Sequence, residues 1–404
     1  MPNSLLTIDK ITRECLRLAH EKATFLGTIN RQFDNSWSDE GPTGSTLRIR
    51  LPSQYVRTQG QRVIDVQDSV QQSVSLVRAT QDHVAMRFNS RERALDLDEF
   101  SKLHLEPAMA TLVAGVESDV IQGVTRLVYN TAGTAGTPPT DLAAVGAARA
   151  RLNQNLAPKD GNRYVQMDSV TMGGMVNGLR GLFQDSAQIK EQYREGMIGR
   201  TGMADFYENE RVWSMTNGSD VTGTTDASNA AVTDGGSNIT FDATASISVN
   251  VGQVFTVAGV FMVHPETKAT MGVLQQYVIT ALGASRTMTV SPSTFLTGAR
   301  KNVGTSTGAD LATTAFNNQT LTFVGAASVT LMQNLMYHKD AFTFATAALP
   351  IIGGAEECVT KTYDGISLRV WSDGDIRNDE VITRIDMIYG WAAIRPQWAC
   401  RITS

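Results

Sequence analysis

The chain has 404 residues and a mass of 43.7 kDa, which suggests two or three domains with cores that need no disulfide or metal. Its 35 basic and 40 acidic residues give a net charge of −5 and a pI near 5.6, which excludes a strongly basic nucleic-acid binder. Three cysteines without a CxxC spacing argue against a disulfide framework or a zinc site. The start lacks the features of a secretory signal, and no run reaches the roughly 20 apolar residues of a membrane span. We therefore expect a cytoplasm-made protein that does not enter a membrane.

The first predicted element is an amphipathic helix. Ile8, Ile11, Cys15 and Leu18 follow one another at helical spacing, and charged residues cover the opposite side. Two interpretations remain open: the apolar face docks on the chain's own domain, or it contacts another subunit.

Residues 46–88 read as an extended arm. Leu47, Ile49 and Leu51 alternate with arginines, and the run 84–88 alternates in the same way. A long two-stranded arm is only marginally stable alone, so we expect it to lie on something else.

Helical patterns follow the arm. The apolar spacing predicts a long helix over 107–130, with Pro107 at its first position. A second helix is expected over 140–155, with Thr140 as its cap, and Asp168 and Ser186 are typical caps of two more.

Composition changes near Met215. Residues 215–325 are poor in charge and rich in Thr, Ser, Gly and Asn. Short β-like runs recur there, at 246–251, 253–263, 276–281 and 287–290. This spacing favours a small barrel or sandwich inserted between two stretches of mixed α/β sequence.

The last part returns to mixed structure. A hairpin is predicted from Val359–Tyr363 and Ile366–Trp371, because Asp364-Gly365 suits a two-residue turn. Val381–Tyr389 is expected to form another strand.

No catalytic pattern emerges. Phosphate-loop, dinucleotide and nucleophile-elbow motifs are missing from the sequence, and the five histidines are scattered without metal-ligand spacing. Cys358 follows two glutamates, which disfavour a reactive thiolate. We expect no enzyme activity, no catalytic or metal-binding residue and no cofactor.

Several segments of the tail resemble the C-terminal part of a tailed-phage major capsid protein, in the gene-five coat protein family of short-tailed Salmonella-type phages. The segments are 334–342, 348–350, 363–370, 375–379, 384–391 and 395–396. A weaker likeness to the inserted barrel of that family lies in 252–260 and 290–292.

The resemblance implies an α+β chain with the Hong Kong-97-type capsid fold. The implied parts are an N-terminal arm 1–43, an extended β-hairpin loop 44–90, a peripheral domain with a spine helix 91–139, an axial domain 140–211 and 326–358, an inserted all-β domain 212–325, and C-terminal strands 359–404.

The implied function is a major capsid protein that self-assembles as pentamers and hexamers into an icosahedral virion shell. The shell would enclose double-stranded DNA without sequence-specific binding, and it would be assembled in the bacterial host cytoplasm. Expected partners are other copies of the chain, a scaffolding protein and a portal. Candidate subunit-interface residues are the four apolar residues of the first helix and the arginines of the loop, namely Arg48, Arg50, Arg57, Arg62, Arg78 and Arg87.

Two other functions remain as alternatives. A cellular nanocompartment shell would share the fold, but such shells usually lack the inserted barrel. An adhesion or carbohydrate-binding protein is suggested only by the Thr/Ser/Gly-rich segment.

Overall fold

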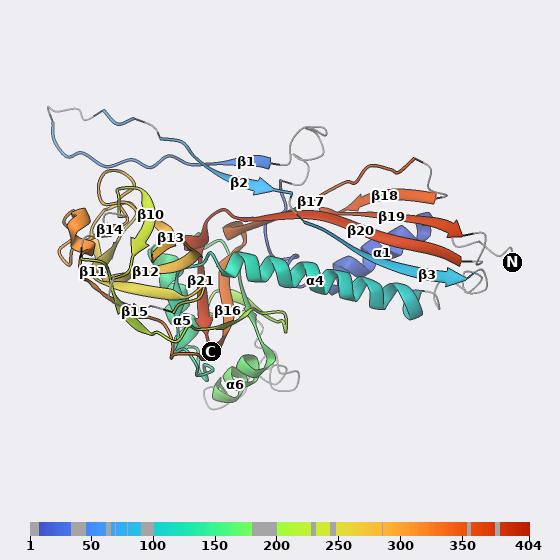
Figure 1. Cartoon of the computed structure of the whole chain (residues 1–404), viewed down its shortest axis with the longest axis horizontal. Helices are drawn as coiled ribbons and strands as arrows, with labels where there is room; N and C mark the ends of the chain where they lie inside the picture. The colour runs from blue at the N-terminus through green and yellow to red at the C-terminus, as the bar shows by residue number, and fades with distance from the viewer. Residues whose placement is uncertain are drawn as a thin grey trace. The chain divides into compact units, whose positions relative to one another are not determined.

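The computed structural model is of mixed α+β type, with many strands and few helices (Figure 1). It describes residues 8–33, 46–61, 66–68, 70–78, 80–89, 101–179, 200–227, 232–242, 248–284, 286–353, 357–375 and 380–404. The chain divides into two compact units, which are treated separately below. Unit 1 comprises residues 1–49, 74–120 and 342–394, and unit 2 comprises residues 50–73, 121–341 and 395–404.

Unit 1 is built on one antiparallel sheet. Its strands run in the order β17 (Phe342–Ala347), β20 (Glu380–Ala393), β19 (Ile366–Asp375) and β18 (Glu357–Tyr363). β18 and β19 form the predicted hairpin, and Asp364 and Gly365 both have positive φ, at 44° and 76°, as that two-residue turn requires.

The run that includes Val84 differs from the expected arm. β3 (Thr80–Asn89) pairs along its whole length with β20, from Thr80 opposite Tyr389 to Asn89 opposite Glu380. The predicted alternation is present, but it serves the sheet of unit 1. The two-stranded arm is therefore shorter than expected and is made of β1 (Thr46–Leu51) and β2 (Gln72–Val77).

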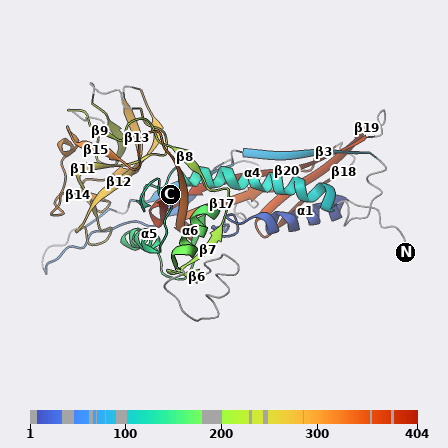
Figure 2. The same cartoon turned by 90° about the horizontal axis from the view of Figure 1, so that it is seen from below.

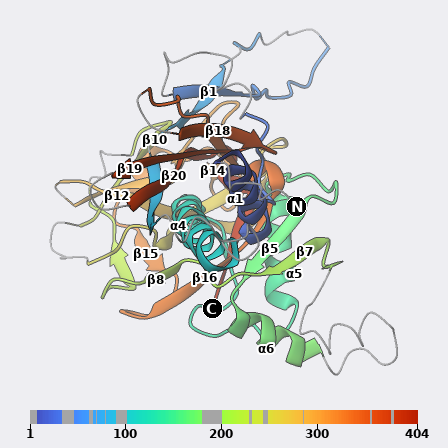
Figure 3. The ribbon, with the colours of Figure 1, turned by 90° about the vertical axis from the view of Figure 1, so that its right-hand side faces the viewer.

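Two helices lie on the same face of the unit 1 sheet (Figures 2 and 3). They are α1 (Ile8–Lys22) and α4 (Glu106–Thr125), the latter preceded by a π-helical turn, η3 (Ser101–Leu105). α1 carries ion pairs at helical spacing on its outer side, from Arg13 to Asp9 and from Arg17 to Glu14 and Glu21.

α4 ends five residues earlier than the predicted 107–130. The backbone N–H groups of Leu127 and Val128 bond three residues back, which tightens and closes the helix. The side chain of Asn130 then donates to the carbonyls of Gln397 and Ala399, at 3.2 and 3.0 Å, and leads the chain into a strand. The apolar residues after Thr125 therefore serve this turn instead of a further helical turn.

Asp386 on β20 organises the unit 1 sheet. It is fully buried and accepts hydrogen bonds from Arg369 at 2.7 Å, Trp371 at 3.0 Å and Arg384 at 2.6 Å. Burial by itself raises the pKa of Asp386, but these donors outweigh it and hold the pKa below the usual value. The buried carboxylate thus holds β19 and β20 together through Arg369 and Trp371 of β19, while Arg384 contacts it from the same strand, β20.

The first sheet of unit 2 has the C-terminal strand in its interior. The strand order is β4 (Thr131–Ala132), β21 (Ala399–Thr403), β16 (Thr330–His338), β5 (Arg163–Met167), β7 (Ala204–Glu208) and β6 (Arg200–Thr201), and β8 (Ser214–Thr216) also pairs with β16. The final residues are buried, so this end of the chain is part of the core.

Two helices accompany this sheet. α5 (Ala143–Gln154) starts later than predicted: Thr140 does not cap it, and Asp141 accepts the N–H of Ala143 at 2.9 Å. α6 (Ser169–Leu179) is capped as predicted, because Asp168 accepts the N–H of Thr171 at 3.1 Å. The predicted cap Ser186 lies outside the described residues.

The second sheet of unit 2 comes from the charge-poor segment. Its strands are β10 (Gly236–Thr240), β13 (Thr287–Thr294), β12 (Thr270–Leu282), β11 (Val254–Val263), β15 (Thr320–Phe323) and β9 (Thr222–Thr224), with β14 (Val303–Gly304) beside β11. Three predicted runs lie within β11, β12 and β13. The predicted strand 246–251 is wrong over 248–251, where the chain forms a loop and a turn before Gly252, and 246–247 lie outside the described residues.

This second sheet has its own core. Fully buried aromatic rings stack within it, with Phe255 and Tyr277 5.8 Å apart. Short 3₁₀ turns complete the described helical elements, namely η4 (Thr313–Phe316), η5 (Lys339–Ala341) and η6 (Pro396–Trp398).

Gly252 marks a close approach within unit 2. Its φ is +96°, and an added Cβ would lie 2.4 Å from the ring of Trp213. The ring of Trp213 lies below two guanidinium groups, those of Arg126 and Arg401, at 5.3 and 5.7 Å from its centroid. The buried Arg401 also donates to the carbonyl of Gly252 at 2.7 Å, so only a glycine fits between the indole and the C-terminal strand.

Candidate functional site

The described residues could hold two kinds of chemical site, a metal centre or a reactive thiol. They contain no group of three or more His, Cys, Asp or Glu side chains placed to hold a metal ion. Burial raises the pKa of Cys15 and of Cys400 to about 12, so both thiols stay protonated. None of the described helices is long and apolar enough to span a membrane.

The four apolar candidates of α1 are buried by the chain itself. Ile8, Ile11, Cys15 and Leu18 are at most 7% exposed, and the helix packs on β18 and β19. Of the two interpretations, this arrangement favours a helix docked on its own domain. A subunit contact through these four side chains stays a prediction, and it would require the helix to leave its strands.

Polar contacts fix α1 and the segment that follows it to β18 and to the β18–β19 turn. Arg31 donates to the backbone carbonyl and to the carboxylate of Asp364, at 2.8 and 3.0 Å. His20 contacts the carbonyl of Tyr363 at 3.0 Å and meets its ring edge to face. Asp9 pairs with Lys361, whose hydrogen bond lowers the pKa of Asp9. These contacts therefore hold α1 at both of its ends against β18 and the β18–β19 turn.

The arginines of the loop fall into two groups. Arg48, Arg50 and Arg57 are exposed and form no ion pair with a described carboxylate. Arg87 is exposed but pairs with Glu380 at 3.3 Å, and Arg78 is half-buried. Arg62 lies outside the described residues. Three of the candidate arginines, Arg48, Arg50 and Arg57, are therefore exposed on β1 and the residues that follow it.

Exposed apolar side chains share this loop, a feature that the sequence reading missed. Tyr55, Val56, Val66 and Val70 are 59%, 37%, 84% and 56% exposed. The sequence could have shown this, because the neighbouring residues of the loop are mostly polar and provide no apolar side chains to cover these four. Together with the arginines they make a contact surface without a partner in the described chain.

Side chains keep the two sides of the loop in register. The amide of Gln67 donates to the carbonyl of Val56 at 2.6 Å and accepts its N–H at 2.8 Å, as a backbone partner would. Ser53 donates to the carbonyl of Val70 at 3.4 Å, in the same antiparallel register. The loop is therefore a continued two-stranded arm beyond β1 and β2.

Comparison with known proteins gives a family. The model of the family described as P22 coat protein, gene protein 5, matches residues 43–401. No curated protein matches the sequence.

Comparison with solved structures gives matches of low sequence identity. A chain of Mycobacterium phage Che8 is 11% identical to this chain, and the match has a TM-score of 0.47. The match covers 94% of this chain and 90% of the phage chain. A chain from the mature capsid of bacteriophage PhiM1 is 10% identical, with coverages of 91% and 83% and a TM-score of 0.42. A virus-like particle from Pyrococcus furiosus is 8% identical, with coverages of 98% and 98% and a TM-score of 0.39.

The family match covers residues 43–401, nearly the whole chain, and it fits a molecule whose loop exposes apolar and arginine side chains. The chain therefore belongs to the P22 coat protein (gene protein 5) family and is a major capsid protein that forms a phage shell.

Proposed function

We propose that the loop surface of residues 46–78 makes the main non-covalent contact between neighbouring subunits of the shell. The observation that carries this proposal is the coexistence, on the described part of the loop, of exposed apolar side chains and of three arginines, Arg48, Arg50 and Arg57, that form no ion pair with a described carboxylate. Burying the four apolar residues on a neighbour removes apolar area from water, at about 25 cal/mol per Å². The arginines add bidentate contacts to carboxylates, and these set the direction of the contact.

We further propose that the parts of the chain have the roles implied by the family. α4 acts as the spine of the peripheral domain (91–139), and the strands β5, β6, β7 and β16 belong to the axial domain (140–211 and 326–358). The sheet of β9–β15 with its own core is the inserted domain (212–325), and residues 359–404 complete the body. The separate core and the low charge of the β9–β15 segment support this assignment.

The remaining partners follow from the same proposal. Capsomers of five and six copies close around double-stranded DNA without sequence-specific binding, together with a scaffolding protein and a portal, in the host cytoplasm. The net charge of −5 supports a container, because a strongly basic lining would bind phosphate tightly and in a salt-dependent way.

A nanocompartment shell remains the second candidate, and the match to a phage coat protein family disfavours it. The contents of native particles separate the two, since DNA supports the phage shell and an enzyme cargo supports the nanocompartment.

The loop is tested by removing its cations. The triple variant R48Q/R50Q/R57Q should fold like the wild type, because these side chains have no ion pair within the described chain, but it should assemble more slowly and at lower yield. Sedimentation velocity measures assembly, and urea unfolding measures stability. R87Q is the control, since Arg87 pairs with Glu380 of its own chain. Unchanged assembly of the triple variant would refute the contact.

A further inference from the structure

A cavity of about 350 Å³ lies within unit 2, and its size falls in the range of small-molecule sites, about 300–1,000 Å³. Its walls come from the base of the loop, from β11 and β12, from the segment that follows β13, and from the segment before β21. No role described above uses this cavity.

Its lining is rich in positive charge. Lys268, Arg300, Lys301 and Arg395 contribute to the walls, which contain no carboxylate. Lys301 is already neutralised, since its ammonium donates to Asp310 at 2.5 Å and to the carbonyl of Gly308 at 2.8 Å. The other three cations form no ion pair with a carboxylate of the described chain. Asp234 and Asp340 lie near enough to Arg300 and Arg395 to act on them electrostatically, but neither forms an ion pair with them, so positive charge exceeds negative charge along the walls.

The free cations are held in place. The guanidinium of Arg300 stacks on the ring of Phe295, 3.8 Å from the centroid, and that of Arg395 stacks on Trp398 at 4.1 Å. The ammonium of Lys268 donates to the carbonyl of Lys301 at 3.2 Å. Stacking fixes the guanidinium planes and leaves their N–H edges free, so a ligand would not have to order these side chains.

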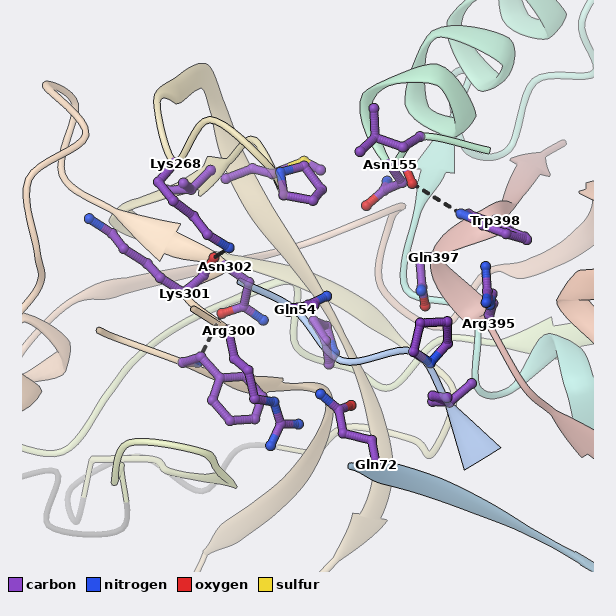
Figure 4. Close-up of a pocket in the computed structure, with 18 of the residues that line it drawn as sticks. Gln54, Gln72, Asn155, Lys268, Arg300, Lys301, Asn302, Arg395, Gln397 and Trp398 are labelled. Atoms are coloured by element: carbon purple, nitrogen blue, oxygen red, sulfur yellow. Dashed lines mark hydrogen bonds between the residues drawn. The ribbon is translucent and has the colours of Figure 1, made fainter. Parts of the chain in front are cut away.

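Neutral donors complete the lining. Figure 4 shows Gln54 between Lys268 and Arg300 on one side and Arg395 and Gln397 on the other. Amide groups at these positions add donors between the cations without adding negative charge.

Partial burial disfavours the charged forms of the three cations. Burial lowers the pKa of Lys268, of Arg300 and of Arg395. A bound anion would offset this cost, because opposite charge favours the charged form of each group.

We propose that this cavity is a binding site for a small, multiply charged oxyanion that carries phosphate or carboxylate groups. Two stacked guanidinium groups can bind such groups in a bidentate way, and the ammonium of Lys268 adds a point charge. The volume suits a ligand the size of pyrophosphate or citrate and excludes duplex DNA.

Titration calorimetry of the full chain, with pyrophosphate and with citrate at matched ionic strength, tests the proposal. Saturable binding of either probe supports it, and the better probe identifies the preferred group. R300Q and R395Q should each weaken binding at least tenfold, since a hydrogen bond to a charged group contributes about 1.5–3 kcal/mol.

K268Q should weaken binding too, and K159Q is its matched control because Lys159 is an exposed lysine outside the cavity. Melting curves show whether each variant still folds. If an arginine variant unfolds, the affinity of K268Q for the probe still tests the proposal. Binding of neither probe to the wild type, or equal weakening by K159Q, would overturn the proposal.

Discussion

At the scale of single residues, the buried carboxylate of Asp386 is the best-partnered charge of the unit 1 sheet. Asp386 has three donors around one buried carboxylate, which come from β19 and β20, whereas the exposed pair of Arg87 and Glu380 joins β3 and β20 of the same sheet. Removing one partner of a buried ion pair costs far more than removing an exposed one. The two pairs therefore form a natural comparison within one sheet.

D386N should destabilise the chain by about 3–5 kcal/mol, because it leaves Arg369 buried without its counter-charge. R87Q should change stability by only about 0–1 kcal/mol. Urea unfolding of both variants measures the difference, and a D386N variant as stable as R87Q would contradict the role given to this carboxylate.

The same carboxylate predicts a dependence on pH. Because the pKa of Asp386 is lower in the folded chain, its contribution is complete above the unfolded value, about 3.9, and is lost as the pH falls through the folded value. The acid loss of stability should therefore be smaller in D386N than in the wild type.

Gly252 predicts a steric effect that can be separated from backbone strain. G252A meets Trp213, whereas G272A shares a positive φ (+69°) but has open space around the new Cβ. Both variants bear the backbone penalty, so G252A should lose about 1–3 kcal/mol more than G272A. Thermal melting of the pair tests this, and equal losses would show that the indole can move aside.

At the scale of elements, the sequence predicted correctly those features that depend on a few neighbouring residues. The turn at Asp364-Gly365 and the cap at Asp168 were identified correctly, because each depends on a few neighbouring residues. The run 84–88 was correctly read as a strand, but its partner β20 lies some 300 residues away and could not be read from spacing.

The candidate site was predicted in part, for the same reason. The loop arginines were visible in the sequence, and Arg48, Arg50 and Arg57 are exposed as a contact surface requires. The apolar face of α1 looked equally suited to a partner or to the chain itself, since periodicity shows that a face is buried but not what covers it. The cationic cavity joins segments that lie far apart in the sequence, and no local pattern marks it.

The loop also predicts how the shell is held together. Residues 44–90 contain no lysine, and a guanidinium stays protonated, so the loop has no amine that could form an isopeptide bond. Particles boiled in detergent under reducing conditions should release one band near 43.7 kDa. A ladder of covalent oligomers would show that the shell is cross-linked.

The β9–β15 segment should fold alone. Its strands surround a core of their own, so a fragment of residues 215–325 should give an all-β circular dichroism spectrum and dispersed amide signals in NMR. A spectrum typical of disorder would mean that the segment depends on the rest of the chain and is no independent domain.

At the scale of the whole molecule, the family match and the exposed side chains of the loop both point to contacts between copies of the chain. Its arm presents apolar side chains and arginines, its described residues hold no metal centre, and its family is that of a phage coat protein. Each exposed ion pair contributes only about 0–1 kcal/mol, but a closed shell repeats the same contact in every subunit.

Self-assembly is the central claim, and sedimentation velocity combined with negative-stain imaging of the purified chain tests it most directly. The chain should sediment as rings of five or six copies or as closed shells, and the R48Q/R50Q/R57Q variant should shift toward smaller species. A chain that stays strictly monomeric at every salt concentration, with and without a scaffolding protein, would contradict the account.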